Sequence, residues 1–314
     1  SHDRYFLNRM VTSIAEMADG TVTLYVGDYD HYLVEREARH ALLEARQRNQ
    51  AKRVAEIERF IDRFRFQATK ARQVQSRVKM LEKIERIEVG ADARRIHFAF
   101  PQPPRTGRTV ARLVGVHKAY GDNVVYAGME FAVERAQRVA LVGVNGAGKS
   151  TLLKMLAGVL PFDRGERTLG ANVAVHYYAQ HQLDALDPGR TVLEELEQAD
   201  WTAPLQRLRS ILGSFLFSGD QVDKRISVLS GGEKARVALA KMLVRPAALL
   251  CMDEPTNHLD LASKEVLEGA LAAFTGTIVF ISHDRYFINR IATQVVEVDR
   301  GRLTTHLGNY DDYV

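Results

Sequence analysis

The sequence predicts an α/β domain over residues 109–314, preceded by a helical hairpin over residues 35–97. Two observations carry this prediction. From about residue 109 onward, short β-rich apolar runs alternate with helical patterns, which is typical of strands that feed helices around a central sheet. By contrast, residues 35–89 contain neither Gly nor Pro, which indicates long helices. The length of 314 residues leaves room for two domains.

The composition excludes several classes of protein. Hydrophobic residues make up 46% and charged residues 26% of the chain, as in ordinary globular proteins. No apolar run approaches the roughly 20 residues that a membrane-spanning helix needs, so we expect no membrane span. The single cysteine, Cys251, excludes an internal disulfide and fits a reducing cytoplasm, where we expect the protein to work. Because Cys251 stands in an apolar run, we predict a buried strand residue and not a reactive thiol.

The positive charge is concentrated in one segment. The chain carries a formal net charge of +4, with 43 Lys and Arg against 39 Asp and Glu. Residues 35–95 alone hold 17 Lys and Arg against 10 Asp and Glu, a net charge of +7, which leaves −3 for the remainder. This segment is therefore where we expect a polyanion to bind.

The beginning of the sequence repeats a stretch near its end. Residues 1–9, SHDRYFLNR, return as SHDRYFINR at residues 282–290, and residues 27–32 match residues 308–313 at the same offset of 281. Two segments in register without a gap over more than thirty residues indicate an internal duplication. Within the first copy, residues 21–26, TVTLYV, are predicted to form a short strand.

The segment without Gly and Pro is predicted to fold as two helices. Its apolar residues recur at helical spacings of three and four in two sets, which are Val54, Ile57, Ile61 and Phe64, and then Val74, Val78, Leu81 and Ile84. The periodicity breaks over residues 65–70, so we predict antiparallel helices joined by a turn near residues 66–71. One continuous helix is the alternative.

Residues 98–108, FAFPQPPRTGR, separate the helical hairpin from the α/β domain. Three closely spaced prolines exclude helix and interior strand, so we predict an extended linker. Beyond the linker, apolar runs at residues 139–142, 248–252 and 277–281 are predicted to be strands of the central sheet.

The strongest motif is residues 143–151, GVNGAGKST, which match the P-loop pattern between a predicted strand and a helical run. Glycines let successive backbone N–H groups turn toward phosphates, and the helix N-terminus adds its positive dipole. We predict that Lys149 reaches the β and γ phosphates of a nucleotide and that the Ser150 hydroxyl binds Mg²⁺. The other predicted nucleotide contacts of the loop are Gly143, Asn145, Gly146, Gly148 and Thr151. A glycine-rich turn without a ligand is the alternative.

An acidic pair at the end of an apolar run supplies the expected partner of the metal. Asp253 closes the predicted strand over residues 248–252, and Glu254 follows it. We predict that Asp253 holds Mg²⁺, through a water molecule, as the second acid of P-loop enzymes does. Glu254, one residue further into the site, is placed to orient and deprotonate the attacking water.

Further motifs give the α/β domain a specific resemblance. Residues 229–233, LSGGE, residues 253–260, DEPTNHLD, and residues 281–284, ISHD, follow the P-loop in this order. They resemble the signature motif, the Walker B motif with its D-loop, and the switch histidine of ATP-binding cassette proteins. Residues 177–181, YYAQH, resemble the Q-loop of these proteins, and Tyr120 stands where the family places an aromatic residue that stacks on adenine. The resemblance implies the P-loop NTPase fold of an ATP-binding cassette.

The resemblance also implies roles for individual residues. In such cassettes two nucleotide-binding domains pair head to tail around two ATP molecules, each held between one P-loop and the opposing signature motif. Gln180 would sense Mg²⁺ and the attacking water, and His283 would hold the γ-phosphate. The signature and D-loop residues expected at a nucleotide are Ser230, Gly231, Gly232 and Asp260. A surface histidine and an aromatic residue that merely packs are the alternatives for His283 and Tyr120.

The whole chain resembles one branch of the cassette proteins. DEPTNHLD together with SHDRYF is similar to the ABC-F family, whose soluble members carry two cassettes on one chain, joined by a helical hairpin. In that family the hairpin reaches into the tRNA exit-site region of the ribosome, toward the peptidyl tRNA. The resemblance implies four parts, which are a C-terminal remnant of a first cassette (1–34), the basic hairpin (35–97), the extended linker (98–108) and a second cassette (109–314). His2 would be the switch histidine of the first cassette.

The tip of the hairpin is the predicted contact with RNA. Residues 59–79 hold seven basic residues and one acidic residue, Asp62. A tip rich in Arg and Lys can contact the phosphates of rRNA and tRNA with an affinity that falls as the salt concentration rises. The residues predicted to make these contacts are Arg63, Arg65, Lys70, Arg72, Arg77 and Lys79. A solvated helical face is the alternative.

The expected activity is Mg²⁺-dependent ATP hydrolysis that is coupled to engagement of the ribosome and tRNA. Because this sequence shows one P-loop and one signature motif, we expect slow hydrolysis unless two copies pair head to tail. The alternative is the ATPase subunit of an ABC transporter with a separate membrane partner, although such a subunit would lack the 55-residue helical insert. An ATPase of the chromosome or repair type is excluded, because only 81 residues separate Lys149 from Ser230.

Overall fold

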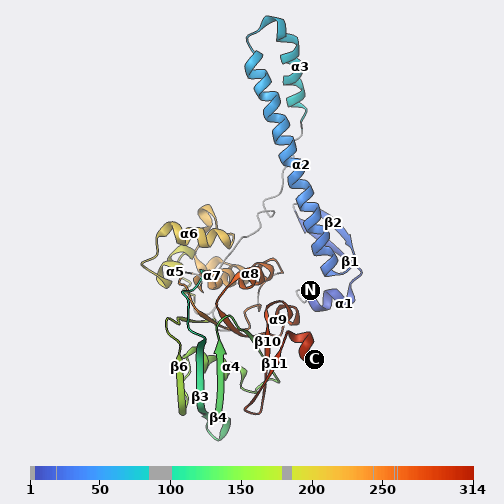
Figure 1. Ribbon diagram of the computed structural model, residues 1–314. Coiled ribbons are helices and arrows are strands. Elements are labelled where there is room, and N and C mark those ends of the chain that lie inside the picture. The colour runs from blue at the N-terminus through green and yellow to red at the C-terminus, as the bar shows by residue number, and fades with distance from the viewer. Residues whose placement is uncertain are drawn as a thin grey trace. The chain divides into compact units, whose positions relative to one another are not determined.

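The computed structural model describes residues 4–18, 20–84, 101–178, 186–242, 244–257, 259 and 261–314. These residues form two compact units, one up to residue 84 and the other from residue 101 (Figure 1). Three predicted site residues, His2, Gln180 and Asp260, lie outside the described residues, and so do residues 85–100 of the predicted hairpin and linker.

The first unit combines a short β-hairpin with long helices. Its elements are α1 (Arg4–Met10), β1 (Ser13–Ala18), β2 (Thr21–Val26), α2 (Tyr29–Phe64), η1 (Ala68–Lys70) and α3 (Ala71–Glu82). The predicted strand over residues 21–26 is thus confirmed, and it pairs antiparallel with β1. Helix α2 begins six residues before the predicted boundary at residue 35, because Asp28 caps it by accepting a 2.9 Å hydrogen bond from the backbone N–H of His31.

Helices α2 and α3 confirm the predicted hairpin and exclude one continuous helix. The helical pattern stops at Phe64 and resumes at Ala71, after a turn that includes the single 3₁₀ turn η1. Ile57 on α2 and Val74 on α3 are 3% and 9% exposed, so both helices contribute a buried apolar side chain. The guanidinium of Arg77 lies 5.4 Å from the ring centroid of Phe60 and adds a cation–π contact between the helices.

The second unit contains the predicted α/β domain. Its strands are β3 (Thr109–Tyr120), β4 (Asn123–Glu134), β5 (Arg138–Val142), β6 (Arg164–Leu169), β7 (Val175–Tyr178), β8 (Leu249–Asp253), β9 (Thr277–Ile281), β10 (Gln294–Asp299) and β11 (Arg302–Leu307). Its helices are α4 (Lys149–Ala157), α5 (Val192–Ala199), α6 (Leu205–Ser214), α7 (Gly231–Met242), α8 (Leu261–Ala273), α9 (Arg285–Ile291) and α10 (Tyr310–Tyr313), with the 3₁₀ turns η3 (Gly219–Asp223) and η4 (Ile226–Val228). The predicted strands at residues 139–142, 248–252 and 277–281 are confirmed as β5, β8 and β9.

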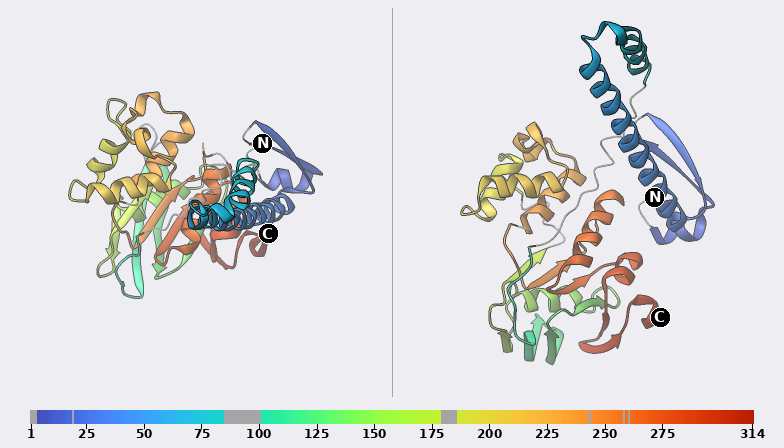
Figure 2. Two further views of the ribbon diagram at one scale, coloured as in Figure 1. Left: turned by 90° about the horizontal axis from the view of Figure 1, so that it is seen from above. Right: turned by 45° about the horizontal axis from the view of Figure 1, so that its top comes forward.

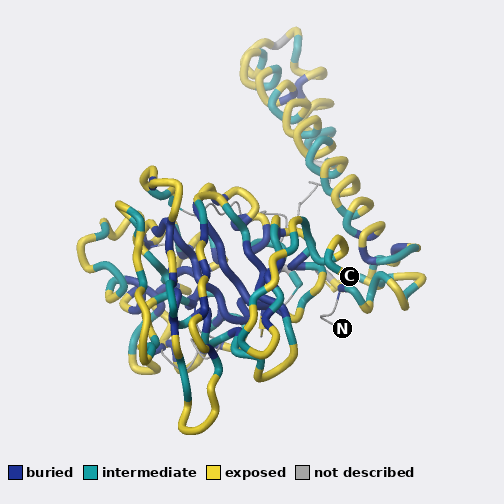
Figure 3. Tube along the Cα trace, turned by 60° about the horizontal axis from the view of Figure 1, so that its bottom comes forward, coloured by how far each residue is buried: buried dark blue, intermediate teal, exposed yellow. Residues whose placement is uncertain are grey.

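Two sheets organise the second unit. Six strands form the central sheet in the order β11-β10-β5-β9-β8-β7, in which only β11 runs antiparallel to its neighbour. A second, antiparallel sheet has the order β4-β3-β6. Helices α5, α6 and α7 pack against one another as a separate helical group (Figure 2). In the central sheet, β8 and β9 are buried along their whole length, whereas the edge strand β11 is partly exposed (Figure 3). Cys251 on β8 is fully buried, and this burial raises the pKa of its thiol to about 12.

The internal duplication is repeated in three dimensions. Adding 281 to the bounds of α1, β1 and β2 gives the bounds of α9, β10 and β11, and α2 and α10 begin at equivalent residues. Even the side-chain contacts recur: Asn8 accepts a 3.0 Å hydrogen bond from the backbone N–H of Asp30, as Asn289 does from Asp311. The two copies therefore encode the same local structure.

The proline-rich segment is anchored to the second unit over the residues that the structure describes. Residues 101–107 form neither helix nor strand. The amide oxygen of Gln102 accepts a 3.2 Å hydrogen bond from the backbone N–H of Thr275, and Arg135 donates a 2.9 Å bond to the carbonyl of Thr106. Among the described residues, no helix combines the length and the apolarity needed to cross a membrane.

Candidate nucleotide-binding site

Three neighbouring parallel strands place the predicted site residues at one edge of the central sheet. Ile281, the last residue of β9, pairs with Leu141 of β5 on one side and with Asp253 of β8 on the other. The carboxyl ends of these strands are therefore level, and loops that follow them meet. The P-loop follows β5, Asp253 and Glu254 follow β8, and His283 follows β9.

The P-loop has the backbone conformation that its glycines permit. Gly143, Gly146 and Gly148 have φ angles of 139°, 83° and 106°, a region that side chains with a Cβ atom rarely adopt. A Cβ atom at Gly143 would collide with the carbonyl oxygen of Val298 on β10, and one at Gly148 would lie 2.8 Å from Val125. The glycines thus serve two purposes, since they allow the turn and also let the loop pack against neighbouring strands.

Lys149 is the first residue of α4 and points back into the loop. Its ammonium donates hydrogen bonds of 2.7 and 2.9 Å to the carbonyl oxygens of Gly143 and Val144. Burial lowers the pKa of Lys149, while the carboxylates of Glu254 and Asp253 act in the opposite direction. Ser150 and Thr151 follow in the first turn of α4, and Asn145 lies exposed in the loop.

The acidic pair is buried beside the P-loop lysine. Asp253 and Glu254 are 4% and 6% exposed. The backbone of Glu254 has a φ of 52° and its N–H donates a 3.0 Å hydrogen bond to the carbonyl of Ile281, which ties the end of β8 to β9. Desolvation raises the pKa of the Glu254 carboxyl, and the neighbouring His283 opposes this shift. A carboxylate with a raised pKa is a better proton acceptor than an exposed one.

His283 adjoins Glu254 although its side chain remains 69% exposed. Its backbone N–H donates a 3.2 Å hydrogen bond to Oε2 of Glu254, and its Nε2 lies 3.6 Å from Oε1. Asp284 anchors the loop that carries His283, because it caps α9 and accepts a 2.9 Å hydrogen bond from Lys264 of α8. The structure therefore brings together Lys149, Glu254 and His283, as the sequence predicts.

These residues fit a magnesium nucleotide. Oε1 of Glu254 is buried without a hydrogen-bond partner among the described residues, which leaves one acceptor for a ligand. The hydroxyl of Ser150 and the carboxylate of Asp253 are the hard oxygen ligands that Mg²⁺ prefers. The glycine turn and the start of α4 supply backbone N–H groups for phosphates.

The signature residues lie at the start of α7. Ser230 accepts a 3.3 Å hydrogen bond from the backbone N–H of Glu233, whose carboxylate accepts a 2.8 Å bond from the backbone N–H of Ser230. This reciprocal pair is a capping box. The spacing S-x-x-E is the sequence signature of a capping box, so the capping role of Glu233 could have been predicted from the sequence. A Cβ atom at Gly231 or Gly232 would meet nothing within 4 Å, so this helix start is open to a partner.

Tyr120 ends β3, where the β3–β4 hairpin turns, and its side chain is 50% exposed. On the paired strand, the hydroxyl of Tyr126 donates a 3.1 Å hydrogen bond to the carbonyl of Gly148. The hairpin that carries Tyr120 is thus tied to the P-loop.

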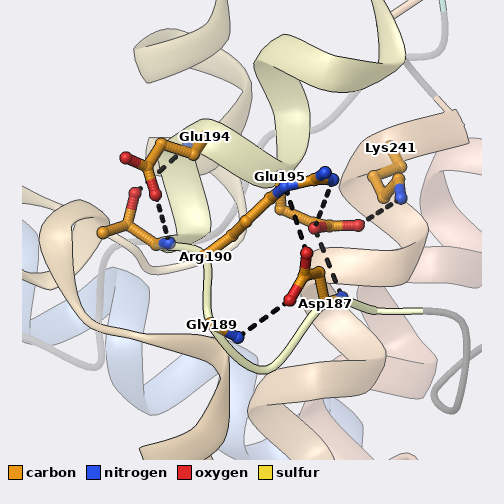
Figure 4. A network of polar contacts seen from close by, with 7 residues as sticks. Asp187, Gly189, Arg190, Glu194, Glu195 and Lys241 are labelled. Carbon is orange, nitrogen blue, oxygen red and sulfur yellow. Dashed lines mark hydrogen bonds and ion pairs between the residues drawn. The ribbon is translucent and has the colours of Figure 1, made fainter.

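An ion cluster around the buried carboxylate of Glu195 was not predicted from the sequence (Figure 4). Glu195 on α5 is 1% exposed, and its carboxylate pairs with the ammonium of Lys241 on α7 and lies 3.6 Å from Arg190. Asp187 in turn pairs with Arg190 and donates its backbone N–H to Glu195. The cluster joins the loop that precedes α5 to the helix that begins with the signature motif. The sequence of α5, VLEELEQA, gives no signal that Glu195 pairs with Lys241 of another helix.

Glu254→Gln is expected to stabilise the fold at neutral pH. The folded-state pKa of Glu254 is raised, so stability is fully present below the ordinary carboxyl pKa and is lost as the pH rises through the raised pKa. Gln stays neutral, so the variant gains about 1.4 kcal/mol for each pH unit between the folded and unfolded pKa values. Thermal unfolding between pH 4 and 8 measures this gain, which should vanish at the acidic end. The exposed Glu130→Gln serves as control. An equal stability difference at every pH would contradict the prediction.

Glu195→Ala is expected to lower the free energy of unfolding by about 3 kcal/mol, because Lys241 and Arg190 lose their buried counter-charge. The neighbouring exposed Glu194 completes the capping box of Thr191, so Glu194→Ala should cost about 1 kcal/mol. Urea unfolding of both variants measures the difference. Losses of equal size would show that the cluster adds nothing beyond helix capping.

Comparisons with known proteins agree with this geometry. Two family profiles, both described as ABC transporter, match residues 15–98 and 126–257. Over its whole length the chain is 42% identical to YdiF of Bacillus subtilis (strain 168), 38% identical to YbiT of Escherichia coli O157:H7 and 38% identical to ABC transporter F family member 2 of Arabidopsis thaliana. It spans 49%, 60% and 47% of these relatives, which is about half of their length.

A solved structure shows the same fold. The dimeric structure of MJ0796, a bacterial ABC transporter cassette, matches with a TM-score of 0.55 at 20% identity, over 63% of this chain and 98% of that one. The strand-end site, the matching family profile and the solved structure lead to one conclusion: this chain contains an ATP-binding cassette domain with the P-loop NTPase fold, and its relatives include a member of the ABC transporter F family.

Proposed function

We propose that this chain binds and hydrolyses ATP with Mg²⁺ and couples its nucleotide state to RNA of the ribosome through the α2–α3 arm. The observation that carries the proposal is the joint presence in one chain of a P-loop, a buried acidic pair and a signature motif together with a basic helical hairpin. The relatives of the ABC-F type support it, because they match the arm and the cassette together.

The hydrolytic step follows from the buried acid. A water oxygen attacks the γ-phosphorus, the bond from this phosphorus to the β,γ-bridging oxygen breaks, and ADP leaves. Glu254 accepts the proton of the water, helped by its raised pKa. Lys149 binds the β and γ phosphates, and His283, held against Glu254, contacts the γ-phosphate. Ser150 and Asp253 would hold Mg²⁺, which neutralises charge on the phosphates.

Two cassettes are needed for one complete site in this proposal. The open start of α7, with Ser230, Gly231 and Gly232, would cover the ATP on the P-loop of an opposing cassette. In a longer protein, a first cassette would supply this opposing surface. Two copies of this chain would supply it by pairing head to tail. Gln180 and Asp260 are proposed to complete the site as the Q-loop and D-loop residues.

The first β-hairpin is proposed to be the end of that first cassette. In the second unit, β10 pairs in parallel with β5, and the equivalent of Met17, Val298, is fully buried. In the first unit, Met17 is 81% exposed and Phe6 is 49% exposed, whereas Phe287, the equivalent of Phe6, is 0% exposed. Apolar side chains of this kind are normally covered. The rest of a first cassette is the occupant that fits them.

The arm tip has the chemistry of an RNA contact. Of its predicted contact residues, Lys70 is half-buried and the others, Arg63, Arg65, Arg72, Arg77 and Lys79, are exposed. Phe66 in the turn between the helices is 94% exposed, and an exposed aromatic ring among cations can stack on an unpaired base. Arg63 and Lys70 lie 5.4 and 6.0 Å from the ring of Phe64, which holds these cations near the turn.

Complementation between two inactive variants tests the shared site. Lys149→Ala removes the phosphate lysine, and Ser230→Arg blocks the signature surface, so each variant alone should release phosphate from ATP at least tenfold more slowly than the parent chain. A mixture should regain activity, because a mixed pair contains one intact site. The parent activity should rise more than linearly with protein concentration. If the activity of the parent chain rises strictly linearly with protein concentration and the mixture of variants regains no activity, pairing of two copies is excluded.

Ribosome co-sedimentation tests the arm. The Glu254→Gln chain with ATP should sediment with ribosomes, and the triple change of Arg65, Lys70 and Arg72 to Gln should weaken binding at least tenfold and reduce its salt dependence. The matched control changes three exposed cations further from the turn, Arg46, Lys52 and Arg53, to Gln. If the Glu254→Gln chain stays off ribosomes and associates with membranes, the transporter alternative replaces this proposal.

A further inference from the structure

We propose that Lys118, held in place by Asp163, is a positioning residue that makes the ring of Tyr120 a platform for the adenine base. The inference rests on the proposed function, because it concerns how the same site recognises the base of ATP. It assigns a role to two residues that lie outside the phosphate-binding motifs.

Lys118 covers one face of the tyrosine ring. Its ammonium lies 5.1 Å from the ring centroid of Tyr120, which is within cation–π range. The side chain of Lys118 is only 12% exposed, whereas Tyr120 is 50% exposed. The exposed face of the Tyr120 ring is therefore the face that Lys118 does not cover.

Asp163 fixes the backbone on both sides of Lys118. Its Oδ2 accepts a 2.8 Å hydrogen bond from the backbone N–H of Ala119, and its own N–H donates a 2.9 Å bond to the carbonyl of His117. Its Oδ1 lies 3.7 Å from the ammonium of Lys118. One aspartate thus holds the end of β3, where the strand register is irregular, and also neutralises the lysine.

The strand pairing directs this platform toward the P-loop. Lys118 on β3 pairs directly with Tyr126 on β4, so the two side chains share a face of the sheet. The hydroxyl of Tyr126 donates a 3.1 Å hydrogen bond to Gly148 in the P-loop. The residues that would hold the phosphates and the ring that would hold the base are therefore linked through one cross-strand pair.

The arrangement has a chemical consequence for the base. An ammonium on one face draws π-electron density of the ring toward itself, so the opposite face becomes a better stacking partner for an electron-rich purine. A ring held by Lys118 also loses little rotational freedom when a base binds. Lys118 should thus contribute to affinity for ATP without touching the phosphates.

Two ligands separate a base platform from general support of the site. Binding of Mg²⁺·ATP and of Mg²⁺ with inorganic tripolyphosphate, which lacks a base, is measured by isothermal titration calorimetry. Lys118→Met keeps the length of the side chain and removes its charge. It is expected to weaken ATP binding about fivefold and to leave tripolyphosphate binding unchanged. Lys118→Arg, which keeps the cation, should restore ATP binding. Asp163→Asn should weaken ATP binding in the same selective way.

The outcomes distinguish the inference from the proposed function. If Lys118→Met weakens the binding of both ligands equally, or of neither ligand, Lys118 does not act through the base and the inference is wrong. If Tyr120→Ala leaves ATP binding unchanged, the platform itself does not exist. If the parent chain binds neither ATP nor tripolyphosphate, the proposed function fails instead. Thermal unfolding of each variant checks that it is folded, and Lys118→Arg keeps the test valid if Lys118→Met is unstable.

Discussion

The level ends of β5, β9 and β8 are the constraint on which the site depends. Backbone pairing sets Ile281 between Leu141 and Asp253, so three loops that are far apart in the sequence begin at the same height of the sheet. A shift of one strand by a single residue would turn its buried side chains to the opposite face. Strands β8 and β9 are buried along their whole length and β5 at every residue but its first, so such a shift would be costly. The position of the candidate site residues is therefore a consequence of core packing.

The buried charges of Glu195 and Glu254 are compensated in different ways. Around Glu195 the carboxylate is matched by the cations of Lys241 and Arg190, so the cluster is structural and joins α5 to α7. The charge of the Glu254 carboxylate is compensated only in part. Its Oε1 has no hydrogen-bond partner among the described residues, and the pKa of the carboxyl is raised. A buried acceptor that is left in this state costs stability. A general base also needs a raised pKa, so the loss of stability and the proposed proton transfer have the same physical cause.

The duplicated segment shows that the same local structure can be buried or exposed, depending on the elements around it. Both copies form a short helix, a β-hairpin and a following helix with equivalent bounds, so local sequence is sufficient to specify these elements. In the second copy, β5 covers the hairpin edge and Val298 is buried. In the first copy, the equivalent Met17 is exposed among the described residues. Burial is thus decided by partners that the repeat itself does not contain.

Sequence alone determined the elements and the motifs. Glycine spacing, apolar runs and the lack of Gly and Pro in the arm predicted the P-loop, the strands and the helical hairpin, because these features depend on local conformation and periodicity. Only the tertiary structure decided that Glu254 is desolvated beside His283, that Glu195 is matched by Lys241, and that Lys118 lies over Tyr120. The first two depend on residues 29 and 46 positions apart, and the third on a strand end that Asp163 holds from 44 residues away. Such contacts follow from packing between elements, which periodicity in one segment does not encode.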